Sequence, residues 1–228
     1  METMSLYLVA TPIGNLEDIT LRALRILREV DLIAAEDTRH SKKLLDHYDI
    51  KTPLVSYHSH SSKGKVEHLI RELQSGKSVA LISDAGTPGI SDPAWSLTQA
   101  ALEADITLVP IPGASAFLTA LMASGLPMDK FVYLGFLPVK KGRQTLILSF
   151  KDEERTVVFY ESPHRLARTM AQLSELLGPD RYAIVARELT KMHEQFHRGT
   201  LADLATHFKK VNPKGEMAIL IAPKGFHK

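Results

Sequence analysis

The sequence predicts an α/β protein built from two α/β domains that meet near Pro112. Short apolar runs alternate with amphipathic stretches of about ten residues, which is typical of parallel strands joined by helices. After Ile111–Ser115 the pattern changes, and two strands follow one another between Tyr182 and Thr200. We therefore expect domains at residues 1–112 and 113–228, the first on a mostly parallel sheet and the second on a mixed sheet.

Strands and helices alternate regularly in the first half. Leu21, Leu24 and Leu27 recur on one face of the first helical stretch, and Asp92 followed by Pro93 is a favourable helix start. The expected strands are 6–10, 32–35, 54–57, 79–83 and 107–111. The expected helices are 20–30, 41–48, 65–75 and 93–104.

The second half begins with an expected helix at 116–124. Its expected strands are 131–135, 156–160, 182–187, 194–200 and 216–222, and its other expected helices are 141–150, 167–177 and 201–209. The sequence contains no internal repeat of fixed period and no low-complexity segment.

Composition excludes several classes of protein. The chain has 228 residues with 44% hydrophobic content, which is enough for a sizeable core. It has no Cys, so disulfides, thiol catalysis and a Cys-type zinc site are excluded. No apolar run reaches the roughly 18 residues of a membrane helix, and the start does not resemble a signal peptide. We expect a cytoplasmic protein without a membrane partner. Its net charge of +2 neither indicates nor excludes a nucleic-acid partner.

The loop "SDAGTPGISDP", Ser83–Pro93, directly follows the apolar strand Val79–Ile82. Its glycines permit positive φ angles and its prolines fix φ near about −65°, so the chain must bend sharply and stiffly there. Ligands usually bind at the carboxyl ends of strands in open α/β sheets. We interpret the loop as a ligand cradle, with an ordinary tight turn as the alternative.

Polar groups gather at other predicted strand ends. The Pro/Gly loop Thr11–Thr20 follows the first strand but matches neither G-x-G-x-x-G nor a P-loop. A second cluster, Glu36–Arg39, follows the second strand. A third lies in Phe159–Arg165, where a strand ends at Glu161 and a helix starts at Pro163. A fourth lies at the end of another strand, in Ala186–Lys191. Capping or structural ion pairs would account for any one cluster. Several clusters at strand ends indicate a shared cleft.

Two histidine-containing stretches resemble metal sites only superficially. "HEQFH", His193–His197, matches a zinc-protease pattern that needs both histidines on one helical face. Here the set Met192, Glu194 and Phe196 alternates with the set His193, Gln195 and His197, and "RGT" follows as a turn. This period of two indicates a strand, so we expect no metal. "YHSHSSKGK", Tyr57–Lys65, lacks an evident third ligand and is interpreted as a flexible basic loop that faces a polyanion.

Nine motifs occur in order between about residues 5 and 222: "ATPIGNLEDIT", "AAEDTRHS", "SDAGTPGISDP", "IPGASA", "GFLP", "FYESPHR", "ARELTK", "RGTL" and "KGEMAI". Together they strongly resemble the bacterial small-subunit ribosomal RNA 2′-O-ribose methyltransferase I family, within the tetrapyrrole-methylase-like (class III) S-adenosylmethionine enzymes. The chain departs from the family's usual "DPG" at "DPAW", Asp92–Trp95. Many members also continue past the last strand with a small helical region, whereas this chain ends at Lys228.

The resemblance implies two α/β domains with S-adenosyl-L-methionine in the cleft between them, and a homodimer. It implies methyl transfer to the 2′-hydroxyl of a cytidine in the decoding region of 16S ribosomal RNA, in the small ribosomal subunit. One alternative is methylation of a tetrapyrrole or another small molecule on the same fold. A second is a non-catalytic ribosome-assembly factor. The motifs "EDTR", "FYESPHR" and "RELTK" favour the RNA branch.

The resemblance also assigns candidate site residues. By motif, the cofactor contacts are Pro12, Ile13, Asp84, Gly86, Thr87, Ile90, Ser115 and Ala116, with Tyr160, Leu189 and Ala218 from the second domain. In this assignment Gly86 lets the backbone approach the ligand. A ribose hydroxyl is a poor acid and benefits from a base. Candidate bases are Asp37 and Glu161, with Arg39 and Lys191 orienting phosphate or ribose.

Basic side chains are also expected in loops or at helix starts near the strand ends. If they line the mouth of the cleft, they form a basic rim that engages phosphates. These residues are Lys42, Lys43, Lys63, Lys65, Lys140, Lys141 and Arg143.

Overall fold

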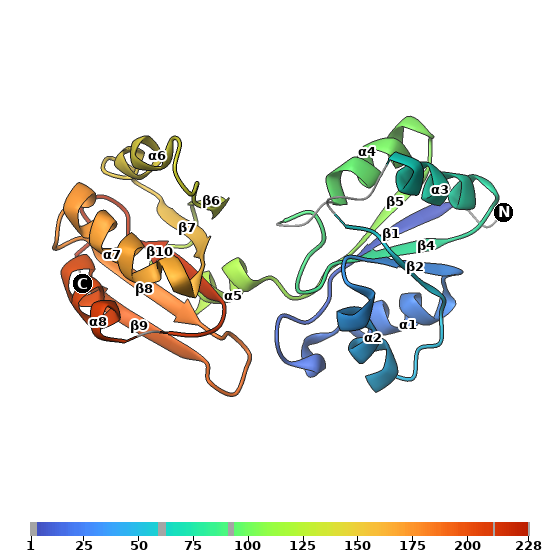
Figure 1. Cartoon of the computed structure of the whole chain (residues 1–228), viewed down its shortest axis with the longest axis horizontal. Helices are drawn as coiled ribbons and strands as arrows, with labels where there is room; N and C mark the ends of the chain where they lie inside the picture. The colour runs from blue at the N-terminus through green and yellow to red at the C-terminus, as the bar shows by residue number, and fades with distance from the viewer. Residues whose placement is uncertain (1–3, 59–62, 91–93, 212, 228) are drawn as a thin grey trace. The chain divides into compact units, whose positions relative to one another are not determined.

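The computed structural model describes residues 4–58, 63–90, 94–211 and 213–227. The chain divides into two compact units, residues 1–115 and 116–228, which are described one at a time (Figure 1). The expected domain ranges, 1–112 and 113–228, stay a prediction. The helix start expected at Asp92 and Pro93 and residues 59–62 of the predicted basic loop lie outside the described residues.

The first unit is built on a five-stranded sheet in which every pair of neighbours is parallel, in the order β3-β2-β4-β1-β5. The strands are β1 (Ser5–Val9), β2 (Leu32–Ala35), β3 (Leu54–Ser56), β4 (Val79–Ile82) and β5 (Thr107–Ile111). Because the strands are parallel, their carboxyl ends lie at one edge of the sheet, which we call the carboxyl edge.

Helices cover both faces of this sheet (Figure 1). They are α1 (Leu21–Glu29), α2 (Thr38–His47), α3 (Lys63–Gln74) and α4 (Ala94–Glu103), with a 3-10 turn at Leu16–Asp18 before α1. α1 and α2 pack in one apolar cluster with Val9, Ile33 and Ile82, whereas α3 and α4 pack in another with Leu6 and Leu81. The strands are therefore covered on both sides, as the apolar runs predict.

The second unit has a mixed five-stranded sheet in the order β6-β7-β10-β8-β9. β6 and β7 are parallel, and the other neighbours are antiparallel. The strands are β6 (Phe131–Phe136), β7 (Thr156–Glu161), β8 (Tyr182–Arg187), β9 (Gln195–Thr200) and β10 (Met217–Ile221). The predicted mixed sheet and the two successive strands between Tyr182 and Thr200 are confirmed.

The two faces of the second sheet are covered differently. Its helices are α5 (Ala116–Met122), α6 (Arg143–Ser149), α7 (Pro163–Leu177) and α8 (Leu201–Lys210). α6, α7 and α8 pack on one face with Phe159, Val185 and Ile219. Tyr160 alternates with Phe159 along β7 and contacts α5, which lies against β7 and β10 on the opposite face. None of the described helices is long and apolar enough to cross a bilayer.

The strand β9 determines the geometry of "HEQFH". It begins at Gln195, so His197 lies on a strand and His193 lies in the preceding turn. The predicted strand is confirmed, and the two histidines do not share a helical face. The ring centroid of His197 lies 4.8 Å from that of His207 and 5.1 Å from that of Phe208. Across the described ranges, no group of three His, Cys, Asp or Glu residues has a metal-binding arrangement.

Candidate functional site

Three loops are joined by hydrogen bonds at the carboxyl edge. The backbone groups of Thr11 and Gly86 bond to each other in both directions, with N to O distances of 2.9 and 3.0 Å. The Thr87 hydroxyl donates to the Ala114 carbonyl oxygen at 3.2 Å, which connects the loops after β4 and β5. Residues 10–15, 83–90 and 112–115 therefore form one bonded element, which we call the three-loop shelf.

Two glycines allow the loops of the shelf to approach each other. Gly86 has a φ of +84°, and a Cβ there would lie 3.3 Å from Ile13 Cγ2 and 3.5 Å from the Ala114 oxygen. A Cβ on Gly113 would lie only 2.9 Å from Ala10 Cβ. The predicted reason for Gly86 was approach to a ligand, but the structure shows approach to neighbouring loops. Gly113 was not singled out by the sequence analysis, although it lies in "IPGASA".

The shelf brings together most of the cofactor contacts predicted for the first unit. Pro12 and Ile13 are buried within it, whereas Ile90 is 39% exposed. Asp84 is half-buried, and its Oδ1 accepts the Asp37 backbone N–H at 2.9 Å. The shelf ends at the buried Ser115, which Ala116 follows at the start of α5.

Asp37 and Arg39 hold each other at the start of α2. Asp37 Oδ1 accepts the Arg39 backbone N–H at 2.8 Å and the Arg39 Nε–H at 3.1 Å, and Oδ2 accepts from the guanidinium Nη2 at 2.8 Å. These bonds cap α2, and they hold the pKa of Asp37 well below its usual range. A carboxylate with a lowered pKa is a weaker base, and this weakens Asp37 as a proton acceptor.

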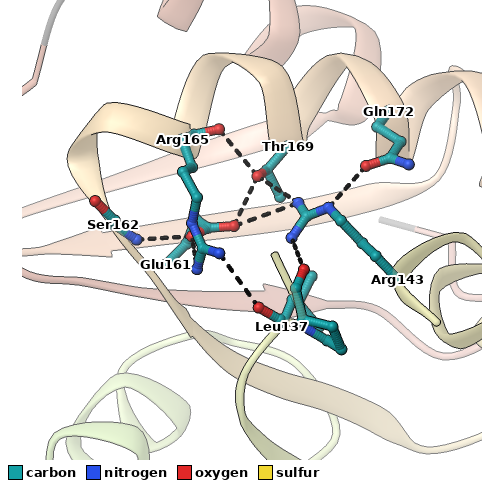
Figure 2. A network of polar contacts seen from close by, with 8 residues as sticks. Leu137, Arg143, Glu161, Ser162, Arg165, Thr169 and Gln172 are labelled. Atoms are coloured by element: carbon teal, nitrogen blue, oxygen red, sulfur yellow. Dashed lines mark hydrogen bonds and ion pairs between the residues drawn. The ribbon is translucent and has the colours of Figure 1, made fainter. Parts of the chain in front are cut away.

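Glu161, at the end of β7, lies inside a buried ion-pair network (Figure 2). Its Oε1 accepts from Arg165 at 2.6 Å and from the Ser162 backbone N–H at 2.8 Å. Its Oε2 accepts the Thr169 hydroxyl at 2.7 Å and Arg143 Nη2 at 3.4 Å. Because both oxygens are occupied and the side chain is fully buried, the structure favours an anchoring role for Glu161 over the predicted role of base.

The two arginines of this network also hold the loop that follows β6. Arg143 donates to the Pro138 carbonyl oxygen at 3.1 Å, and Arg165 donates to that of Leu137 at 3.4 Å. Figure 2 shows both arginines reaching this loop from α6 and α7. Arg143 is only 6% exposed, so the prediction that it belongs to a basic rim is wrong: its charge is used inside the protein.

The other residues of the predicted rim differ in their surroundings. Lys140 and Lys141 are exposed in the loop after β6. Lys42 is also exposed, but its ammonium group pairs with Asp46 at 2.9 Å. Lys65 donates to the hydroxyl of Ser56 at 2.7 Å. Lys43 is exposed on α2, and the side chain of Lys63 lies outside the described part of the chain.

The motifs "ARELTK" and "KGEMAI" meet at Glu188. Its Oε1 accepts the Glu216 backbone N–H at 3.2 Å and the Lys191 ammonium at 3.1 Å, and a Cβ on Gly215 would overlap its carboxylate. Lys191 also pairs with Glu216 at 3.0 Å. Burial lowers the pKa of Lys191, but the two carboxylates outweigh burial and raise it overall. Lys191 is thus held by protein carboxylates, which competes with its predicted role of orienting phosphate or ribose.

The remaining cofactor candidates lie in two places. Tyr160 and Ala218 face each other in register on β7 and β10, and the Tyr160 hydroxyl accepts the Phe117 N–H at 3.1 Å. Burial raises the pKa of Tyr160 above its usual range, so the phenol stays protonated. Leu189 is 7% exposed and lies between Glu188 and Thr190, whose φ angles of 52° and 64° are unusual for residues other than glycine.

Comparison with known proteins identifies one family. Residues 5–205 match the family model described as Tetrapyrrole (Corrin/Porphyrin) Methylases. Three relatives share the name ribosomal RNA small subunit methyltransferase I. The protein from Synechocystis sp. is 55% identical over 95% of this chain and 78% of its own length. The protein from Escherichia coli O157:H7 is 48% identical over 95% of this chain and 77% of its own length. The protein from Thermotoga maritima is 47% identical over 96% of this chain and 98% of its own length.

Solved structures share the fold at lower identity. Diphthine synthase aligns with a TM-score of 0.74 and 18% identity, over 98% of this chain and 91% of its own. A cobalt precorrin-4 methyltransferase aligns with a TM-score of 0.68 and 16% identity, over 96% and 95%. Uroporphyrin-III-C-methyltransferase from Thermus thermophilus aligns with a TM-score of 0.66 and 22% identity, over 95% of this chain and 93% of its own. The predicted α/β fold class is confirmed.

Proposed function

The chain belongs to the tetrapyrrole methylase family, and from this premise we propose that it methylates the ribose 2′-hydroxyl of a cytidine in 16S ribosomal RNA with S-adenosyl-L-methionine. The observation that carries the proposal is the identity of 47–55%, over 95–97% of the chain, to bacterial relatives named ribosomal RNA small subunit methyltransferase I. The structural likeness to tetrapyrrole methylases is much weaker in sequence and supports the fold alone.

The experiment that tests this function is methyl transfer from labelled S-adenosylmethionine to isolated small ribosomal subunits, with the modified ribose mapped afterwards. Transfer to a cytidine 2′-oxygen is expected. Transfer to a tetrapyrrole with none to RNA would support the small-molecule alternative. Tight binding to the subunit without any transfer would support a non-catalytic assembly factor.

The residues of the three-loop shelf fit the cofactor. Ile90 offers exposed apolar surface for the adenine ring or the methionine chain, and Asp84 offers a carboxylate for a ribose hydroxyl or the ammonium group. Pro12 and Ile13, which are buried in the same shelf, are also proposed contacts. We propose that the shelf holds the cofactor, which supplies an activated methyl group when bound. The other proposed contacts are Gly86, Thr87, Ser115, Ala116, Tyr160, Leu189 and Ala218.

The chemical task of the protein is mainly positioning, because a sulfonium centre already has a good, neutral leaving group. Holding the ribose oxygen in line with the methyl carbon supplies much of the rate. Of the two carboxylates considered as bases, Asp37 is the better proposal, because it is about one-third exposed whereas Glu161 is fully buried. Arg39, 90% exposed beside Asp37, is proposed to orient phosphate.

The lowered pKa of Asp37 leads to a pH prediction. A depressed pKa keeps a carboxylate ionised until the pH falls through that low value, so Asp37 should not lose its charge between about pH 8 and pH 5. We therefore expect a pH–rate profile of methyl transfer without a carboxylate limb in this window, and a fall of about 100-fold in kcat for Asp37→Asn. A limb with an apparent pKa near 6, or unchanged kcat in Asp37→Asn, would remove Asp37 from this role.

The loop after β6 is proposed to contact RNA through Lys140 and Lys141. Reversing both charges with Lys140→Glu and Lys141→Glu should cut RNA methylation sharply and leave S-adenosylmethionine affinity unchanged. The wild-type protein should also lose RNA affinity with salt, with a slope of about −0.7 per phosphate contacted on single-stranded RNA. Methylation and cofactor affinity of the variant are measured in parallel.

Lys209 and Lys210 provide the matched control for this double change. They are also adjacent and exposed in the second unit, at the end of α8. Lys209→Glu with Lys210→Glu changes the net charge equally and should leave methylation close to the wild-type rate. If the two double variants behave alike, the loop after β6 has no specific role, and a salt-insensitive rate would favour a small-molecule substrate.

We also propose that the protein is a cytoplasmic homodimer that acts on the assembled small subunit, without a membrane partner. α5 supports a second copy as partner, since Leu118 and Met122 lie one turn apart and are 48% and 69% exposed. A dimer presents the proposed RNA contacts twice, and this would favour a folded target over naked RNA.

A further inference from the structure

Trp95, the single tryptophan of the chain, lies mostly in solvent at the start of α4. It is 73% exposed, whereas Ala94 and Leu97 beside it are 3% and 0% exposed. α4 therefore packs on the sheet through its other side chains and does not use this ring. An indole is large and usually well buried, so an exposed one at the carboxyl edge is available for a ligand.

Contacts of the residue after Trp95 lead to a polar and basic part of the first unit. The hydroxyl oxygens of Ser96 and Tyr57 lie 2.6 Å apart, which places the start of α4 beside the end of β3. Ser56, next to Tyr57, accepts from the Lys65 ammonium through its carbonyl oxygen at 3.2 Å and its hydroxyl at 2.7 Å. A chain of contacts thus links the segment that carries the indole to a cation.

The helix starts near this cation favour an anion as well. Within their described residues, α3 and α4 carry no acidic side chain in the first turn. Their first backbone N–H groups therefore add positive partial charge, which no acidic side chain within these described first turns offsets. An exposed aromatic side chain in the same region as a cation is a combination that suits single-stranded nucleic acid, whose bases stack on aromatic rings while its phosphates meet cations.

We propose that Trp95 is a stacking platform for an unpaired base of the RNA substrate, with Lys65 close to the backbone phosphate. The proposal rests on the proposed function, because it specifies how that substrate is held. A second copy of the chain would gain apolar contact from the indole, but it would not account for the basic surroundings. The occupant is therefore single-stranded RNA.

The single tryptophan makes the test direct, because all indole emission comes from this site. A single-stranded oligoribonucleotide should quench the emission saturably, with the same midpoint as binding followed by anisotropy of a labelled strand. Trp95→Leu should weaken RNA binding about tenfold and raise the KM for RNA, since leucine keeps apolar bulk but has no π face. Trp95→Phe should restore most of the affinity.

Leu102 provides the matched control, because it is 53% exposed on the same helix. Leu102→Ala should bind RNA like the wild type, and S-adenosylmethionine affinity should stay unchanged in all three variants. Quenching by RNA and weakened binding in Trp95→Leu would support stacking even if the wild type transferred no methyl group, so the two proposals can fail separately. RNA binding without quenching, equal RNA affinity in Trp95→Leu, or a Trp95→Leu variant altered only in oligomeric mass would overturn the stacking proposal.

Discussion

Replacing Gly86 with valine is expected to lower S-adenosylmethionine affinity by at least about 100-fold, or close to 3 kcal/mol. The φ angle of +84° is unfavourable for a β-branched residue, and even a Cβ would lie 3.3 Å from Ile13 Cγ2. The branched side chain must push Ile13 out of place, and this disrupts the shelf that we propose as the cofactor site. Titration calorimetry measures the affinity.

Gly76 separates backbone strain from the effect on the shelf. Its φ angle is +94° and a Cβ there would meet nothing within 4 Å, so Gly76→Val carries similar strain in open space. It should lower stability to a comparable degree and leave cofactor affinity unchanged. Unchanged affinity in Gly86→Val, or equal losses in the two variants, would show that the shelf does not hold the cofactor.

The second large effect is expected from Glu161→Ala, which should lower the free energy of unfolding by about 3–5 kcal/mol. The change removes the carboxylate that pairs with Arg143 and leaves the arginine side chain, which is only 8% exposed, without this partner. Urea denaturation gives the free energy, and hydrogen exchange of peptides from α7 and residues 137–142 locates the loosened region. The same loosening should weaken RNA binding through Lys140 and Lys141.

An exposed ion pair of the same unit is the control for this change. Asp152 pairs with Lys224 at 2.6 Å, with side chains 77% and 57% exposed, so Asp152→Ala should change stability by less than about 1 kcal/mol. If Glu161→Ala is equally mild, the buried network is not an anchor. If Glu161→Gln keeps stability and cofactor affinity but loses methyl transfer, Glu161 is the base after all.

Much of the fold could be predicted from sequence because local signals mark its elements. β2, β5 and β8 have the expected bounds, since each is a short apolar run between polar residues or turns. α2 was expected from Ser41 but begins at Thr38, because the Asp37 side chain accepts the Arg39 N–H and extends the helix by a turn. Such a cap depends on one rotamer, which periodicity does not encode.

The contents of the candidate site were less predictable, because they depend on contacts between distant segments. The pattern placed Glu161 and Glu188 correctly at strand ends, but it gave no sign of what each would face. Arg143, at the start of α6, reaches Glu161 at the end of β7. Glu188 packs against Gly215, although β9 and α8 separate the two residues in the sequence. Polar clusters at strand ends therefore predict positions where a residue is either catalytic or a structural anchor. Only the tertiary contacts of each residue distinguish these two roles.

The position of β1 in its sheet has a consequence for synthesis of the chain. β1 is the first strand to be made, yet its partners come late: Leu6 pairs with Val79 on β4 and with Leu108 on β5. At translation rates of about 5–20 residues per second, it waits several seconds for its first neighbour and still longer for its second. Pairing between distant segments is also slow to form. The nascent chain thus exposes an apolar strand that a chaperone must cover or that the growing polypeptide must bury before it meets another copy.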